Sequence, residues 1–205
     1  MAALSALFGR VAPSAPGAAD PSIDAAVLDA AIEFCTQTLC LQRTLAAVTT
    51  VAHQADYTLT QANEVTVKLL GVKLDGSPLR LLTPATLDAL DDVDEQDPGA
   101  ALLAGPMLLR LYPTPAAAGR SVVVRAAMRP AQGATTIDDS LVEWHAAALA
   151  AGATASLLGR PGTTFYNVAA ARAARMVFDD AIAREISATL FGRARARSRP
   201  AVGWC

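Results

Sequence analysis

The sequence predicts an α+β fold in which helices from both ends of the chain form a bundle and a central antiparallel β-rich insertion projects from it. Apolar residues recur at helical spacing in 22–45 and 134–192. Strand-like runs and turn dipeptides fill 46–133. The two termini of the chain show neither the helical nor the strand pattern. We therefore expect an N-terminal arm at 1–21 and an extended C-terminal arm at 193–205.

The first helix is predicted over residues 22–43. Its early turns are acidic and Arg43 stands at its end, a distribution of charge that suits the helix macrodipole. Cys35 and Cys40 lie five residues apart on this stretch. On one continuous helix that spacing would point the two thiols to different faces.

The middle of the chain changes to a strand pattern. Short β-type runs flank a polar corner at 54–56. A longer run, EVTVKLLGVKL, ends at an Asp-Gly dipeptide, which predicts a strand, a tight turn at 75–76 and a returning strand. MLLRLYP and SVVVRAAMRP predict two further strands at 107–113 and 121–130.

An acidic loop follows a short helix that Thr83 caps and Pro84 begins. The spacing of its carboxylates misses the register of an EF-type calcium loop. A solvated loop, or one that faces another subunit, fits the composition better than a metal site. The acidic residues are Asp88, Asp91, Asp92, Asp94, Glu95 and Asp97.

Helical periodicity returns after Pro130 and predicts two helices. The first runs from about 138 to 158, with Asp138 near its start and Gly159 at its end. The second runs from about 165 to 191. Its core-facing side is predicted from the apolar positions 168, 171, 174, 177, 178, 182 and 186.

The sequence lacks the usual marks of catalysis, metal binding and membrane insertion. It contains none of the motifs GxGxxG, GxxxxGK[ST], HExxH and GxSxG. His145 is adjacent to Trp144 on its helix and is expected to be an ordinary partly buried or interfacial residue, while His53 is expected at the surface. Three cysteines indicate no disulfide framework, and no zinc spacing is present. We therefore expect no enzyme activity, no metal, no cofactor and no membrane span.

Charge is divided unevenly along the chain. Residues 1–100 hold five Lys and Arg against thirteen Asp and Glu, whereas residues 101–205 hold twelve against six. Identical copies packed head to tail can use such a division for orientation. The simpler interpretation is that the charged side chains of both halves only face solvent.

The C-terminal arm carries arginine at every second position. In an extended chain this spacing puts all four guanidinium groups on one face, which suits a strand lying along an acidic protein surface with Trp204 as an anchor. Phosphate binding by a nucleic-acid-binding arm, or a solvated tail, are the alternatives. The arginines are Arg193, Arg195, Arg197 and Arg199.

The order of these segments, from about residue 22 to 192, resembles the head-to-tail adaptor proteins of tailed bacteriophages, in particular the tubular, dodecameric type of short-tailed phages. The matching elements are the helix AAIEFCTQTLCLQRTL, the strand YTL, the strand end LYPTP, the closing RP of the insertion, and the pair GA and LL in the penultimate helix. The resemblance implies a structural virion protein made in the host bacterial cytoplasm.

The same resemblance implies a ring of twelve copies at the head-tail interface, between the portal and a tail nozzle or tail-tube protein. Genomic DNA would pass transiently through its lumen, and the loop carboxylates from Asp91 to Asp97 would face that channel or a neighbouring subunit. The C-terminal arm would bind the portal through its four arginines and Trp204.

Overall fold

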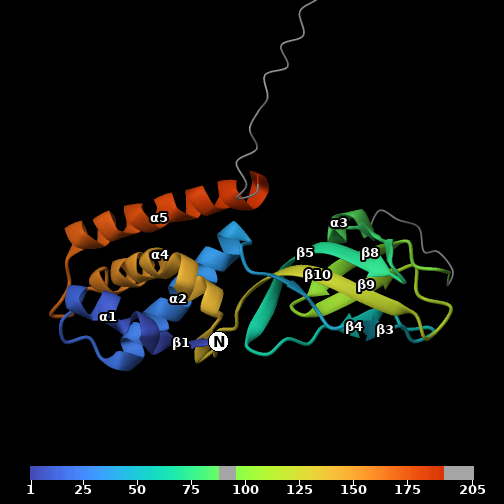
Figure 1. Cartoon of the computed structure of the whole chain (residues 1–205), viewed down its shortest axis with the longest axis horizontal. Coiled ribbons are helices and arrows are strands. Elements are labelled where there is room, and N and C mark those ends of the chain that lie inside the picture. Colours follow the sequence, from blue (N-terminus) through green and yellow to red (C-terminus); the bar gives the residue numbers. More distant parts are fainter. Residues whose placement is uncertain (88–95, 192–205) are drawn as a thin grey trace, which may run out of the picture.

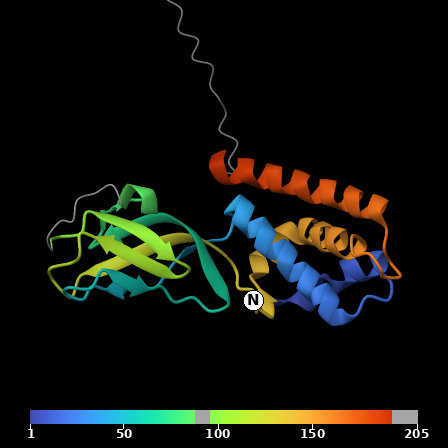
Figure 2. The same cartoon turned by 180° about the vertical axis from the view of Figure 1, so that it is seen from behind.

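The computed structural model describes residues 1–87 and 96–191, and it has helices at one end and β-sheets at the other (Figure 1). The α+β class predicted from the sequence is confirmed. The chain leaves the helical end after α2 (Asp20–Thr38) and returns to it after β10 (Ser121–Pro130). Seen from behind, the N-terminus lies close to the boundary between the two ends (Figure 2).

Three helices make up most of the helical end: α2, α4 (Asp139–Leu158) and α5 (Val168–Phe191). α4 begins as predicted, because the Asp138 carboxylate accepts a hydrogen bond of 2.9 Å from the Ser140 backbone N–H. α5 begins later than expected, because the Asn167 side chain caps it by accepting from the Ala170 N–H at 3.0 Å.

Among the described residues, α4 has the length and apolar composition that a membrane-spanning helix would need. It contacts both α2 and α5. Leu149, Ala153 and Leu157 are completely buried. Packing within the helical end therefore accounts for the apolar character of α4.

The helices approach one another closely at Gly152 of α4. A Cβ atom added there would lie 2.9 Å from the Cβ of Ala30 on α2 and 3.0 Å from the ring of Phe178 on α5. Phe178 also lies over Phe34, with 6.1 Å between ring centroids. The absent side chain at Gly152 thus lets both neighbouring helices contact α4.

Residues 1–15 pack against the helices, so the prediction of an N-terminal arm is wrong for this segment. It forms the short elements β1 (Ala2–Ala3), η1 (Leu4–Leu7), α1 (Phe8–Val11) and η2 (Ala12–Ser14). Its apolar residues recur at helical spacing and are buried in the core. They are Leu4, Leu7, Val11 and Ala15.

The predicted extension of the first helix to residue 43 is also wrong. α2 ends at Thr38, and Leu39 adopts a left-handed conformation with φ of 54°. The next residues form β2 (Gln42–Thr44) along β10, and Leu41 accepts a hydrogen bond of 2.7 Å from the Met128 N–H. Strand pairing therefore replaces the last expected helical turn.

The chain reversal at Leu39 also corrects the predicted position of the cysteines. Cys35 and Cys40 do not point to different faces, because their side chains are close enough to hydrogen-bond. That contact and burial raise the pKa of the Cys35 thiol. The third cysteine, Cys205, lies outside the described residues.

The other end contains two β-sheets. The first has the order β2, β10, β5 and β6, with β3 also paired to β10, and the second has the order β4, β9, β8 and β7. The strands of these sheets not yet given are β3 (Val48–Thr49), β4 (Asp56–Thr58), β5 (Glu64–Leu74), β6 (Ser77–Pro78), β7 (Arg80–Leu81), β8 (Ala100–Gly105) and β9 (Leu108–Tyr112). Two other short elements are α3 (Pro84–Leu87) and β11 (Thr136–Ile137), which pairs with β1.

Local signals predicted three of the longer strands correctly. β5, β9 and β10 lie where expected, and Asp75 and Gly76 form the turn after β5 with φ of 48° and 85°. The single returning strand that was predicted is instead two short strands. β6 pairs with β5, while β7 joins the other sheet. β7 runs parallel to β8, so the insertion is not wholly antiparallel.

β8 was not predicted from its alanine- and leucine-rich sequence. It pairs with β9 on one side and with β7 on the other. Alanine has low strand propensity, and the pairing with both neighbours overrides it. The Gly105-Pro106 dipeptide that follows is the turn signal that would have revealed this hairpin.

We expect Gly152→Val to destabilise the chain by about 3 kcal/mol, because the added methyl groups would overlap Ala30 and Phe178. Urea unfolding followed by circular dichroism measures this change. Gly9→Val in α1 is the matched control, since nothing lies within 4 Å of a Cβ added there. Equal unfolding midpoints for the two variants would contradict the packing described for Gly152.

Candidate assembly surface

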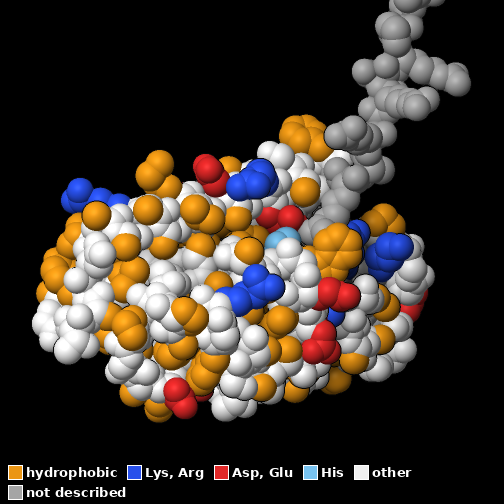
Figure 3. Space-filling view, turned by 60° about the vertical axis from the view of Figure 1, so that its left-hand side comes forward, with side chains coloured by type: hydrophobic (Ala, Val, Ile, Leu, Met, Phe, Trp, Pro, Cys, Tyr) orange, Lys and Arg blue, Asp and Glu red, His pale blue; other side chains and the backbone are white. Residues whose placement is uncertain are grey.

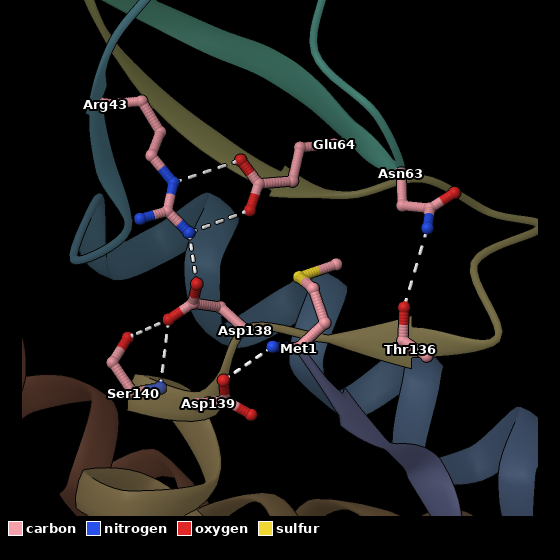
Figure 4. A network of polar contacts seen from close by, with 8 residues as sticks. All are labelled: Met1, Arg43, Asn63, Glu64, Thr136, Asp138, Asp139 and Ser140. Carbon is pink, nitrogen blue, oxygen red and sulfur yellow. Dashed lines mark hydrogen bonds and ion pairs between the residues drawn. The ribbon is translucent and has the colours of Figure 1, made fainter.

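An ion cluster joins the two ends of the molecule (Figure 4). The guanidinium of Arg43, on β2, donates to both carboxylate oxygens of Glu64 at 3.0 and 3.3 Å and also donates to the carboxylate of Asp138. Glu64 begins β5, and Asp138 caps α4. We call these three residues the junction cluster. It connects the first sheet directly to the start of the central helix.

The electrostatics of the junction cluster favour its charged form. The carboxylate of Glu64, followed by that of Asp138, raises the pKa of the Arg43 guanidinium, although partial burial opposes this. Burial likewise opposes ionisation of Asp138, but hydrogen bonds from Ser140 and Arg43 outweigh it and lower the pKa of Asp138. Glu64 is only 5% exposed, so its charge depends on Arg43 for compensation.

Two further contacts lie beside the junction cluster (Figure 4). The terminal amino group of Met1 donates to the carboxylate of Asp139, the first residue of α4. The Asn63 amide donates to the hydroxyl of Thr136 at 3.5 Å, a long contact between the turn before β5 and β11. The N-terminus, both sheet connections and α4 therefore meet in one place.

α5 carries large apolar side chains in contact with water. Of its residues, Ala171, Phe178 and Ile182 are buried, whereas Val168 and Val177 are exposed, so the predicted core side is wrong at those two positions. Met176 is 71% exposed and Phe191 84% exposed. Figure 3 shows the helical end with orange hydrophobic side chains spread between charged ones. Large apolar side chains exposed on one helix in this way are available for contact with a partner.

Two grooves lie along α5. The first, which we call the α2 groove, has a volume of about 610 Å³ and is lined by side chains of α2, α4 and α5. The second, the Trp144 groove, has a volume of about 470 Å³ and lies between α4 and α5. Residues of the α2 groove include Asp29, Ala30, Glu33, Gly152, Arg172 and Arg175. Those of the Trp144 groove include Trp144, His145, Val177, Ala181, Arg184 and Glu185.

Most of the site residues predicted from the sequence lie outside the described residues. This holds for the five residues of the C-terminal arm, Arg193, Arg195, Arg197, Arg199 and Trp204. It also holds for the loop residues Asp88, Asp91, Asp92, Asp94 and Glu95. Their proposed roles therefore stay predictions.

Asp97 is the member of the acidic loop that the structure does describe. Its carboxylate accepts a hydrogen bond of 2.7 Å from Arg120, which also donates to Asp75 at 2.7 Å. The Arg120 bond and a bond from the Ser121 N–H lower the pKa of Asp75. Asp97 is thus tied to the turn after β5 and to the start of β10.

The histidines are placed as the sequence analysis expected. The ring of His145 is largely buried, with its centroid 4.7 Å from that of Phe34, and its Nε2 lies 3.9 Å from Glu185. His53 is exposed in a turn, and its N–H donates to the carbonyl of Pro115 at 2.9 Å. In the described ranges, no group of three or more His, Cys, Asp and Glu residues is placed to hold a metal ion.

Neither the junction cluster nor the exposed side of α5 was predicted from the sequence. Arg43, Glu64 and Asp138 are far apart in sequence, so no spacing rule connects them. The available signal for α5 was Met176 and Phe191, two large apolar residues that lie outside the predicted core-facing stripe of the helix.

Exposed apolar helix surfaces, without a clustered set of ligating side chains in the described part, are the features of a protein built for assembly. The sequence matches the model of the SU10 adaptor protein family over residues 2–203, and the chain belongs to that family. No curated protein matches the chain at a significant level.

Family membership confirms the resemblance to phage head-to-tail adaptors. It makes the chain a structural component of a phage virion and implies a non-enzymatic protein that contacts portal and tail proteins. The dodecameric type stays a prediction.

We expect Arg43→Met to destabilise the chain by about 2–3 kcal/mol, because it leaves the buried carboxylate of Glu64 without its partner. Adding Glu64→Gln should restore part of this loss by removing the uncompensated charge. Arg125→Met is the matched control, since that guanidinium is exposed and donates only to Gln42 among the described residues. Urea unfolding measures all three, and an Arg43→Met midpoint equal to that of the wild type would disprove this role.

Lowering the pH should reduce the free energy of unfolding of the wild type more than that of the Asp138→Asn variant. The pKa of Asp138 is lowered from 3.8 in the folded chain. Its contribution to stability is therefore complete above that value and is lost as the pH falls through the depressed folded pKa. Urea unfolding between about pH 5 and pH 2 measures the difference. Asp180→Asn, which changes an exposed carboxylate on α5, should follow the wild-type curve. Parallel curves for wild type and Asp138→Asn would refute the prediction.

Proposed function

We propose that twelve copies of this chain form a ring that docks onto the portal and connects it to a tail nozzle or tail-tube protein, with a channel through which genomic DNA passes. The observation that carries this proposal is the family match over residues 2–203. The chain would be made in the host bacterial cytoplasm and would function at the head-tail interface of the virion.

The exposed apolar side chains of α4 and α5 support an assembly role. A chain that worked alone would gain stability by burying side chains such as Met176 and Trp144, which are 71% and 65% exposed. Burial against other protein surfaces removes the same apolar area from water. The exposed positions are therefore explained by partners rather than by the fold of one chain.

Docking to the portal is assigned to the C-terminal arm. Four arginines at alternate positions would pair with portal carboxylates, and Trp204 would fill an apolar pocket. The described chain leads to this arm through Leu190 and Phe191, both of which are largely exposed. An apolar contact at the end of α5 would thus continue directly into the ionic contacts of the arm.

The acidic loop is proposed to face the channel or a neighbouring subunit. Carboxylates at Asp91, Asp92, Asp94, Glu95 and Asp97 would repel DNA phosphates and so prevent the lumen from retaining the genome. The ion pair between Asp97 and Arg120 would hold the end of this loop to the sheets.

Binding of nucleic acid by the basic C-terminal arm is the second candidate function. The four arginines favour it, because each can neutralise one phosphate and release a counterion. Such binding would weaken steeply as salt is raised. Because portal binding and DNA binding can be measured separately, the two functions of the arm can be told apart.

Deletion of 193–205 should leave folding unchanged and lower the amount of chain bound to purified portal rings by roughly tenfold or more, because the arginines and Trp204 are removed together. Co-sedimentation with the portal measures binding, and urea unfolding checks the fold. Replacing the four arginines with lysine is the matched control for charge, since lysine keeps the charge but loses bidentate pairing.

Two outcomes of that deletion would count against the proposal. Normal portal binding by the truncated chain would show that the arm is not the docking element. Salt-sensitive DNA binding that the deletion abolishes, together with unchanged portal binding, would support the nucleic-acid-binding alternative.

A further inference from the structure

α5 has two different sides that are both open to solvent. Arg172 and Arg175 line the α2 groove, whereas Val177, Ala181 and Arg184 line the Trp144 groove. At 3.6 residues per turn, these two sets lie on opposite sides of the helix. The side between them, with Phe178, packs on α4 and α2.

The α2 groove is lined by small residues and has an apolar rim. Ala30, Gly152 and Ala155 are among the residues that line it, and none of them has a side chain large enough to fill it. Tyr166 and Val168 stand at its rim and are both exposed. The volume of about 610 Å³ is enough for a large aromatic side chain with its neighbours.

The opposite side presents a side chain of that kind. Trp144 is 65% exposed beside the exposed Val177. A tryptophan so exposed on a helix is an anchor that a partner would bury. One side of the helical end therefore carries an exposed tryptophan beside the Trp144 groove, and the other side carries the larger α2 groove.

Each of the two sides carries one acidic and one basic side chain. Asp29 and Arg172 border the α2 groove, while Glu143 and Arg184 flank Trp144 on the other side. None of these four belongs to an ion pair among the residues that the structure describes. Each side thus offers one acid and one base that have no ion-pair partner within residues 1–87 and 96–191.

We propose that the occupant of the α2 groove is the Trp144 side of a second copy of this chain. Trp144 of one copy enters the groove of the next, and the acid and base of each side face a base and an acid of the other. The inference rests on the proposed ring function and specifies which surfaces of the chain form the contact between subunits.

Head-to-tail contact accounts for both sides at once. A two-fold dimer would use one side twice and leave the apolar residues of the other in water. In a head-to-tail contact every copy uses both sides, and the chain of contacts closes when the rotation between neighbours divides a full turn. The exposed residues on both sides of α5 are then all covered.

Disulfide trapping tests this contact in the full chain. Trp144→Cys and Ser156→Cys place one thiol on the Trp144 side and one in the α2 groove, both at exposed positions. Cys205→Ser is added to every variant to remove the C-terminal thiol. The chains are oxidised with copper phenanthroline at high concentration and resolved on a non-reducing gel, and circular dichroism confirms that each variant folds.

The double variant should form a ladder of dimers, trimers and larger species that a reductant removes, and neither single variant should do so. Absence of the ladder in the double variant overturns the inference. A dimer from Trp144→Cys alone, as abundant as that from the double variant, also overturns it, because it would show a two-fold contact.

Mixing one-sided variants provides a second measurement. Trp144→Arg blocks one side, and Ser156→Arg blocks the other. Each alone should be monomeric by sedimentation velocity, whereas their mixture should form a one-to-one dimer and nothing larger, because one intact contact remains. A mixture that stays monomeric, or single variants that assemble like the wild type, overturns the inference.

These experiments separate this inference from the proposed function. A ladder together with failed portal binding would contradict portal docking and leave the subunit contact standing. Portal-bound rings that form without the ladder would contradict the proposed subunit contact and leave portal docking standing.

Discussion

The guanidinium of Arg43 joins the two ends of this molecule. It binds Glu64 at the start of β5 and Asp138 at the start of α4, so one cation links the sheets to the central helix. Without it, the buried carboxylate of Glu64 would lose its ion-pair partner. The N-terminus and both connections between the ends meet beside this cluster, which therefore helps to hold the sheets against the helices.

Close helix packing determines which surface is left for partners. Gly152 allows α2 and α5 to contact α4, and Phe178 fills the space between them. α5 is thereby held by a narrow strip of side chains, and its other sides remain in water. The same arrangement that buries Phe178 exposes Trp144 and Met176, which is why a stable subunit still presents apolar surface for assembly.

Sequence reasoning succeeded where a signal is local. Asp138 as the cap of α4, the Asp75-Gly76 turn and the strands β5, β9 and β10 each follow from a few neighbouring residues. The candidate site was harder to predict, because the junction cluster brings together residues 21 and 95 positions apart. The predicted arm and most of the acidic loop lie outside the described residues, so the structure adds nothing to their assignment.

The sequence by itself determined the α+β class, the start of α4 and the main strands, because capping, turn and alternation rules act over a few residues. Only the tertiary structure decided where α2 ends, that residues 1–15 pack on the helices, that β8 is a strand and that Cys35 meets Cys40. In each of these cases, contacts between distant segments outweigh weak local preferences. The free energy of burial and strand pairing exceeds the differences in propensity on which local prediction relies.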